Sequence, residues 1–198
     1  MAGLRYFLLY KPYGVLSQFT REHPSHRVLG DLYDFPRDIY PVGRLDKDSE
    51  GLLILTNDKN LNHQLLAPEH AHERTYLVQV EGSPSEQALQ QLRHGVDIRI
   101  KKRVYRTRPA KVQLRAAEPA LPERDPPVRY RKTVPDAWLS LTLTEGKNRQ
   151  VRRMCAAAGY PVLRLVRVRI EQLELGPMAP GAVQELKKEL IYRQLNLS

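Results

Sequence analysis

Residues 41–58 read Pro-Val-Gly-Arg-Leu-Asp-Lys-Asp-Ser-Glu-Gly-Leu-Leu-Ile-Leu-Thr-Asn-Asp, a polar turn followed by an apolar run. The run Leu52–Thr56 predicts a buried β-strand, and the turn ahead of it holds Asp46. A carboxylate on a loop whose downstream anchor is rigid is well placed to act as a nucleophile or a base. Asp and Gly together are also ordinary turn residues, so this stretch alone leaves both interpretations open.

The composition favours a polyanionic partner. The 198 residues include 32 Lys and Arg against 22 Asp and Glu, a net charge of +10, and the apolar share of 41% is ordinary for a globular protein. Such an excess of positive charge is typical of proteins that bind nucleic acid and, less often, anionic membranes. Solubility alone would also account for it.

The cysteine count and the apolar runs bear on the compartment. The single cysteine, Cys155, cannot form an internal disulfide, and its place in a predicted helix favours a buried apolar role. The run Tyr6–Tyr10 is too short for the core of a signal peptide and is ended by Lys11 and Pro12. No stretch approaches the roughly 18 apolar residues of a membrane helix. We therefore expect a cytoplasmic protein.

Strands and helices alternate irregularly along the chain, which favours an α+β fold over a doubly wound one. A long proline-rich connection over 118–135 separates two of the predicted strands. The predicted strands are 5–10, 52–56, 75–81, 96–100, 109–116, 138–143 and a long region 163–175, and the predicted helices are 59–66 after an Asp58 N-cap, 85–94, 148–158 and 185–195.

The sequence gives little support for a metal or a phosphate-binding loop. It contains no Gly-x-x-x-x-Gly-Lys-Ser/Thr pattern and no cysteine pair. His70 and His72 lie near the end of a predicted helix without Cys or carboxylate partners at ligand spacing, which favours a solvated loop over a metal site.

Two later stretches add weight to the first. Residues 74–78 read Arg-Thr-Tyr-Leu-Val, and residues 145–154 read Glu-Gly-Lys-Asn-Arg-Gln-Val-Arg-Arg-Met. Gly-Arg-Leu-Asp, Arg-Thr-Tyr and Asn-Arg-Gln-Val-Arg-Arg-Met, in that order, resemble the motifs of the RNA pseudouridine synthases. Within these synthases, the motifs most resemble those of the RsuA/RluB/RluE/RluF family, and within that family those of the RluE type. When the stretch around Leu165 is included, the resemblance extends from about residue 6 to residue 186.

The resemblance implies a fold. Residues 1–198 would form a single pseudouridine synthase catalytic domain, with two subdomains sharing one sheet. The fold would be α+β, a mixed, largely antiparallel sheet with flanking helices and a central RNA-binding cleft. Because the first predicted strand begins at Arg5, we expect no N-terminal S4-like RNA-binding domain.

The resemblance also implies an activity, the isomerisation of a specific uridine to pseudouridine in 23S rRNA of the large subunit, near the peptidyl transferase region. The reaction gains and loses no atoms, so no cofactor and no metal are expected. The partner would be large-subunit ribosomal RNA, with no membrane, and the protein would act as a monomer. The alternative from another class is a non-catalytic rRNA-binding or ribosome assembly factor on the same scaffold, which fold likeness alone cannot separate from the enzyme.

Three catalytic residues are carried over from the family. Asp46 would be the catalytic carboxylate and must be ionised to act as a nucleophile or a base. Arg152 would pair with it, since a guanidinium forms a bidentate contact that Lys cannot reproduce. Tyr76 would stack on the target base, although its strand pattern also fits a core residue. The three together favour the enzyme over a pure binder.

The remaining predicted site residues would bind RNA. The target base must leave its stack, at a cost of a few kcal/mol that phosphate contacts offset. By resemblance Arg44 lies at the active cleft and Leu165 makes an apolar contact beneath it. Each of the arginines could equally be a solvated surface charge. The candidate phosphate contacts are Arg149, Arg153, Arg164, Arg167 and Arg131.

Overall fold

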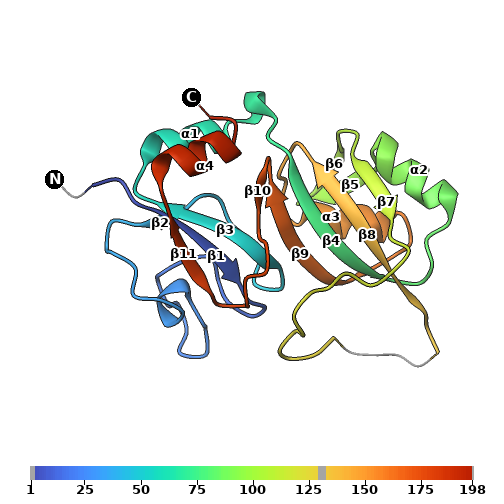
Figure 1. Ribbon diagram of the computed structural model, residues 1–198. Helices are drawn as coiled ribbons and strands as arrows, with labels where there is room; N and C mark the ends of the chain where they lie inside the picture. The colour runs from blue at the N-terminus through green and yellow to red at the C-terminus, as the bar shows by residue number, and fades with distance from the viewer. Residues whose placement is uncertain (1–2, 129–132, 198) are drawn as a thin grey trace. The chain divides into compact units, whose positions relative to one another are not determined.

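The computed structural model of the chain describes residues 3–128 and 133–197 and has an α+β fold, as predicted (Figure 1). Its elements in chain order are β1 (Tyr6–Lys11), η1 (Leu29–Asp31), β2 (Tyr40–Pro41), β3 (Glu50–Thr56), α1 (Lys59–Leu66), η2 (Pro68–His70), β4 (Arg74–Glu81), α2 (Glu86–His94), β5 (Asp97–Ile100), β6 (Arg103–Arg106), β7 (Lys111–Leu114), β8 (Asp136–Leu143), α3 (Gln150–Ala157), β9 (Val162–Ile170), β10 (Leu173–Glu174), β11 (Val183–Leu186) and α4 (Lys188–Gln194).

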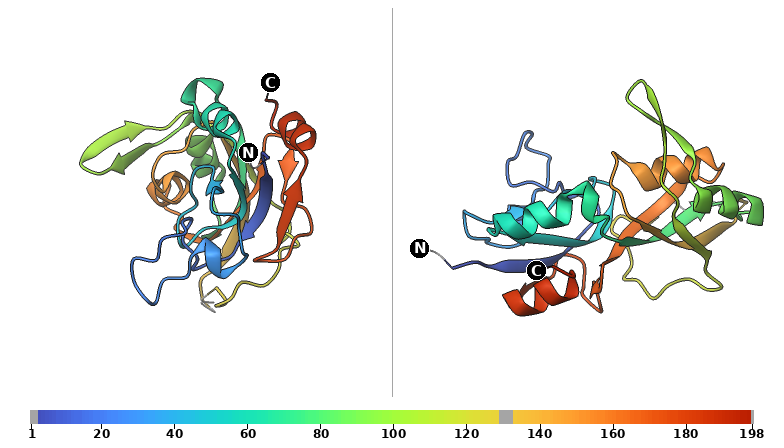
Figure 2. Two further views of the ribbon diagram at one scale, coloured as in Figure 1. Left: turned by 90° about the vertical axis from the view of Figure 1, so that its left-hand side faces the viewer. Right: turned by 90° about the horizontal axis from the view of Figure 1, so that it is seen from above.

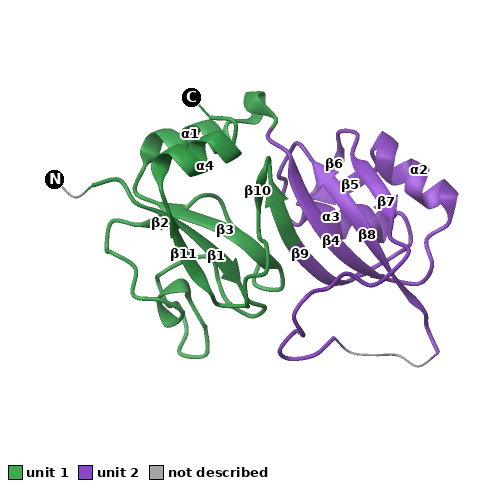
Figure 3. Ribbon diagram, viewed as in Figure 1, with its two compact units in different colours: residues 1–71, 167–198 green, residues 72–166 purple. Residues whose placement is uncertain are grey.

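The chain forms two compact units, residues 1–71 with 167–198 (unit 1) and residues 72–166 (unit 2) (Figure 3). Strand β9 contributes residues to both. The predictions of one catalytic domain over 1–198 and of a central cleft stay predictions. None of the described helices is long and apolar enough to cross a membrane.

Unit 1 is built on two fully buried strands. β1 and β3 pair antiparallel, with Tyr6 opposite Thr56, and every residue of both strands is buried. β11 adds to the other edge of β1, β2 pairs with the end of β3, and the C-terminal part of β9 follows with β10. Burial on both faces explains why β3 reads as a continuous apolar run.

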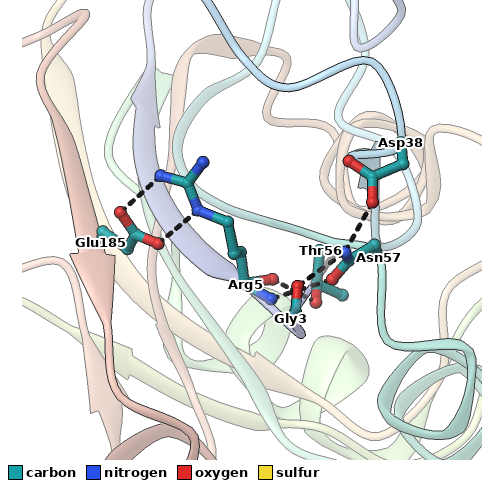
Figure 4. Close-up of polar contacts among 6 residues, drawn as sticks. All are labelled: Gly3, Arg5, Asp38, Thr56, Asn57 and Glu185. Atoms are coloured by element: carbon teal, nitrogen blue, oxygen red, sulfur yellow. Dashed lines mark hydrogen bonds and ion pairs between the residues drawn. The ribbon is translucent and has the colours of Figure 1, made fainter. Parts of the chain in front are cut away.

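Polar side chains fix the edge of this sheet (Figure 4). The guanidinium of Arg5 donates to both carboxylate oxygens of Glu185, at 2.7 and 2.8 Å, and so ties β1 to β11. The backbone N–H of Arg5 donates to Asn57 Oδ1 at 2.9 Å, and the Asn57 amide donates to Asp38 at 2.8 Å. The Thr56 hydroxyl donates to the Arg5 carbonyl at 2.6 Å.

Asp58 joins three elements of unit 1. Its carboxylate accepts from the backbone N–H groups of Asn60 and Leu61, which makes it the predicted N-cap of α1. It also accepts from the hydroxyls of Tyr6 in β1, at 2.7 Å, and of Tyr192 in α4, at 2.6 Å. Burial acts to raise the pKa of Asp58, but the hydrogen bonds from Tyr192, Tyr6 and the two N–H groups outweigh it and lower that pKa.

Unit 2 packs two helices against a sheet. β4 pairs antiparallel with β8, Tyr76 lying opposite Leu141, and β7 pairs with β8 on its far side. The N-terminal part of β9 lies next to β4. Apolar residues from the sheet and from α2 and α3 share one core. Cys155 of α3 is buried in that core, as predicted, and burial raises the pKa of its thiol to about 12.

Several predicted elements need correction. No strand was predicted between 100 and 109, where Lys101, Lys102 and Arg103 formed only a basic segment, but Arg103–Arg106 forms a second strand, β6, which pairs with β5. The predicted helix 185–195 begins only at Lys188, because Val183–Leu186 pairs with β1 as a strand. The predicted strand region 163–175 is broken into β9 and β10, with Glu171 in a left-handed conformation, φ 50°. His72, predicted in a solvated loop, is buried.

Candidate active site

The loop that carries Asp46 is fastened on both sides of that residue. The buried Ser17 hydroxyl donates to the Leu45 carbonyl at 2.8 Å and accepts from the Leu45 N–H at 3.1 Å. On the other side, the N–H of Gly14 donates to the Lys47 carbonyl at 2.8 Å. The Ser49 N–H closes the turn onto the Asp46 carbonyl at 3.0 Å. Asp46 itself is half-buried, so its carboxylate remains partly accessible from this fixed loop.

A buried lysine lies close to the same loop. Lys11, at the end of β1, has no exposed surface, and its ammonium donates to the carbonyls of Pro12 at 3.0 Å and Val15 at 2.7 Å. Burial lowers the pKa of Lys11 to about 7, against the carboxylates of Glu50, Asp48 and Asp46, which act to raise it. Lys11 is therefore an ammonium whose pKa lies near neutral pH and which interacts electrostatically with the carboxylates of this loop.

Two of the predicted arginines lie in unit 1, and they differ in accessibility. Arg44 is exposed and reaches Gln18 Oε1 at 3.4 Å. Arg167 is buried, and its Nε donates to the Leu52 carbonyl of β3 at 2.8 Å. Its Nη2 is buried without a hydrogen-bond partner among the described residues. Arg167 therefore supports the strand after the Asp46 loop, and burial leaves it far less accessible to phosphate than Arg44.

Tyr76 and Leu165 belong to the core of unit 2. Tyr76 is half-buried on β4 and packs against the apolar cluster, while Leu165 of β9 is a buried member of it. The alternative of a core role for Tyr76 therefore has support, and its partial exposure leaves part of the side chain available to a ligand.

Helix α3 presents three arginines from the third motif. Arg149 is exposed at the N-cap, with a left-handed backbone (φ 51°). The half-buried Arg152 donates from Nη1 to the Val162 carbonyl at 3.2 Å. Arg153, also half-buried, donates to the backbone and side-chain oxygens of Asn148 at 3.0 and 3.1 Å.

The other predicted arginines are placed differently. Arg164 is buried and donates to the Pro122 carbonyl at 2.8 Å, so it fastens the proline-rich connection. Arg131 lies outside the described residues.

The predicted residues are thus divided between the units. Unit 1 carries Asp46 and Arg44 together with the buried Lys11, and unit 2 carries Tyr76 and Arg152. Asp46 and Arg152 belong to different units, so their predicted pairing stays a prediction. Within the described part of the chain, no group of three His, Cys, Asp or Glu residues could hold a metal ion.

Sequence reasoning missed Lys11 and Gly14, which it treated as part of a turn, and it gave Ser17 no role. No sequence signal marked Lys11 as buried, since lysines are almost never fully buried unless they are paired. No signal marked Ser17, whose role depends on a contact with Leu45 far along the chain.

An α+β scaffold with a fixed Asp loop and a basic helix is compatible with an enzyme that acts on RNA. The RNA pseudouridylate synthase family matches residues 5–157, and the chain belongs to this family. It is 56% identical, over 87% of its length and 89% of the relative's, to the ribosomal large subunit pseudouridine synthase E of Xanthomonas axonopodis pv. citri.

Two further comparisons agree with this. The chain is 47% identical to the enzyme of the same name in Vibrio parahaemolyticus, over 89% of this chain and 71% of that one. Among solved structures, a crystal structure of a pseudouridylate synthase matches with a TM-score of 0.78 and 28% identity, over 98% of this chain and 75% of that chain.

Proposed function

We propose that the protein converts one uridine of large-subunit ribosomal RNA to pseudouridine. The C1′–N1 bond breaks, the uracil turns, a C1′–C5 bond forms, and the proton lost from C5 is balanced by one gained at N1. Relatives named for this reaction support the substrate class. The same proposal places the uridine near the peptidyl transferase region of the RNA. It also has the protein act as a monomer in the cytoplasm, where rRNA is found.

The double attachment of the Asp46 loop carries this proposal. Ser17 and Gly14 form hydrogen bonds with Leu45 and Lys47, the residues on either side of Asp46. These bonds fix the backbone from which the half-buried Asp46 side chain extends. A reacting group needs this kind of support, because small misplacements cost large factors in rate. A protein that only binds RNA would gain nothing from a carboxylate held among phosphates.

Asp46 acts as the nucleophile or base, Tyr76 contacts the extruded uracil, and Arg152 holds the Asp46 carboxylate in its ionised form. Extrusion of the base is offset by phosphate contacts. Among the predicted RNA-binding residues that the structure describes, the exposed Arg44 and Arg149 and the half-buried Arg153 are the most accessible. The other described members of the predicted set, Arg164, Arg167 and Leu165, are buried, and Arg131 stays a prediction.

The decisive experiment replaces Asp46 by Asn. We expect pseudouridine formation on a large-subunit rRNA transcript to fall by more than about 10²-fold, the lower end of what a positioned acid or base supplies. RNA affinity should change little, because the substitution removes no phosphate contact.

The matched control is Asp48→Asn, which removes another half-buried carboxylate from the same loop. It should keep most of the activity. Turnover by Asp46→Asn at the wild-type rate would exclude the assignment and leave the non-catalytic rRNA-binding protein as the better function.

A further inference from the structure

The hairpin of β5 and β6 is a separate two-stranded element of unit 2. Its register pairs Ile98 with Tyr105 and Arg99 with Val104. Ile98 is buried and Tyr105 packs against the core of the unit, so one face of the hairpin is covered. Val104 on the opposite face is 67% exposed. Figure 2 shows the hairpin projecting away from the rest of its unit.

This hairpin concentrates positive charge. Residues 97–108 contain six basic side chains and one carboxylate, and so carry half of the chain's net charge of +10. The carboxylate, Asp97, lies 3.6 Å from Arg106 at the base of the hairpin. At the tip, Lys101, Lys102 and Arg103 are exposed, and within the described ranges none of them forms an ion pair with a carboxylate.

The hairpin is fastened to the third motif. The Tyr105 hydroxyl donates to Glu145, and the N–H of Arg108 donates to the same carboxylate at 2.9 Å. The side-chain amide of Gln150 donates to Glu145 at 2.6 Å, which connects the hairpin to the first turn of α3. The Lys147 ammonium lies 5.0 Å from the centre of the Tyr105 ring, within the range of a cation–π contact.

A second connection runs from α3 itself, where Arg153 Nη1 donates to the Arg99 carbonyl of β5. The hairpin is therefore attached to α3, the helix that carries Arg152 and has Arg149 as its N-cap. Two cationic elements held together in one unit suit a polymer with regularly spaced negative charges better than a single small anion.

We propose that the tip of the β5–β6 hairpin, Lys101-Lys102-Arg103, is a second RNA-binding surface, which contacts phosphates of nucleotides other than the target uridine. Strands of four residues extend about 13 Å, so the tip reaches well beyond its anchor on Glu145. The contact contributes binding energy rather than chemistry. The proposal rests on the proposed action on ribosomal RNA and adds to it the surface that holds the surrounding RNA.

The test is a triple variant, Lys101→Asn, Lys102→Ser and Arg103→Thr. Asn tolerates the left-handed backbone of Lys101 (φ 56°), and Thr suits a strand. KM for a large-subunit rRNA fragment should rise about tenfold or more, with kcat within about twofold of wild type. The slope of log affinity against log salt should become shallower by about two, since each lost phosphate contact removes about 0.7 to 0.9.

The control removes the same charge from unit 1, at the exposed Arg37, Lys59 and Lys187, each changed to Ser. It should shift KM by less than about threefold. An equal effect of the two triple variants would overturn the proposal, because net charge alone would then explain it. An unchanged KM, or a loss confined to kcat, would also overturn it.

Direct binding separates this proposal from the proposed function. If the wild type forms no pseudouridine, the proposed function fails. The dissociation constants of the same RNA with the wild type, the hairpin variant and the unit 1 control still decide the role of the hairpin. Vesicles containing phosphatidylserine test the other polyanion. Vesicle binding that the hairpin variant loses, with RNA affinity unchanged, would assign the hairpin to a membrane and overturn the proposal.

Discussion

The position of Asp46 depends on its two neighbours. Leu45 is held through both its N–H and its carbonyl by one hydroxyl, that of Ser17, and Lys47 is held through its carbonyl by Gly14. Two hydrogen bonds to a single side chain make Ser17 a positioning residue for the carboxylate. Its removal would leave a buried N–H and a buried carbonyl without their partner, which costs about 1–3 kcal/mol each.

We expect Ser17→Ala to lower kcat about tenfold or more with little change in KM, because a misplacement of about 1 Å can cost 10²-fold. Steady-state kinetics on an rRNA fragment measure both constants. Ser49→Ala is the matched control, since Ser49 is buried in the same loop but contributes its backbone N–H rather than its hydroxyl. A fall in both kcat and thermal stability for Ser49→Ala as large as for Ser17→Ala would refute the specific role of Ser17.

Lys11 makes stability depend on pH. Its pKa is about 7 in the folded chain and near 10.4 in an unfolded one, so the unfolded state binds more protons between these values. The cost of burying the charged ammonium is fully present below about pH 7 and is relieved as the pH rises toward about 10. Relative to Lys11→Met, the wild type should therefore gain stability over this window. Urea unfolding of both proteins at intervals from pH 7 to 10 measures the difference in their free energies of unfolding. A difference that stays constant over this range would contradict the prediction.

At the scale of elements, β3 and β9 approach each other closely at a glycine. Gly51 has φ +103°, and a Cβ there would lie 2.2 Å from the Arg167 carbonyl oxygen and 2.8 Å from its nitrogen. Gly51→Ala should cost about 3 kcal/mol or more, combining overpacking against rigid backbone with an unfavourable φ. Gly30→Ala, where the nearest atom is 4.0 Å away, should change stability by less than about 1 kcal/mol. Chemical denaturation compares the two, and equal losses would contradict the argument.

Elements whose stability is local were predictable from sequence. Asp58 and Ser85 mark the starts of α1 and α2 through hydrogen bonds to their own next turns, so both helices lie where they were predicted. β11 was hidden because Leu186, Leu190 and Ile191 have helical spacing, whereas pairing of Leu186 with Tyr6 of β1 determines the observed strand. Long-range pairing overrides local pattern in such cases.

The site follows the same rule. Motifs identified the loop of Asp46 and the arginines of α3, but no pattern in the sequence could show that Ser17 holds Leu45 or that Tyr105 is tied to Glu145. The tip of the β5–β6 hairpin was hidden for another reason. Its left-handed residue is Lys101 rather than Gly or Asn, so the usual turn signal is missing.

For the whole molecule, charge determines how binding responds to salt. The net charge of +10 includes exposed cations in both units, Arg44 in unit 1 and Arg149 with the hairpin tip in unit 2. If about five phosphates are contacted, the affinity for RNA should fall on the order of 10²-fold between 50 and 200 mM salt, because each contact releases condensed counterions. Measuring this with Asp46→Asn keeps the substrate unmodified throughout the titration. A flat response would mean that shape and base contacts dominate, and that the basic surfaces of both units serve solubility. A steep response that the hairpin variant reduces, and the unit 1 control leaves largely intact, would place part of the electrostatic contacts on the hairpin tip of unit 2.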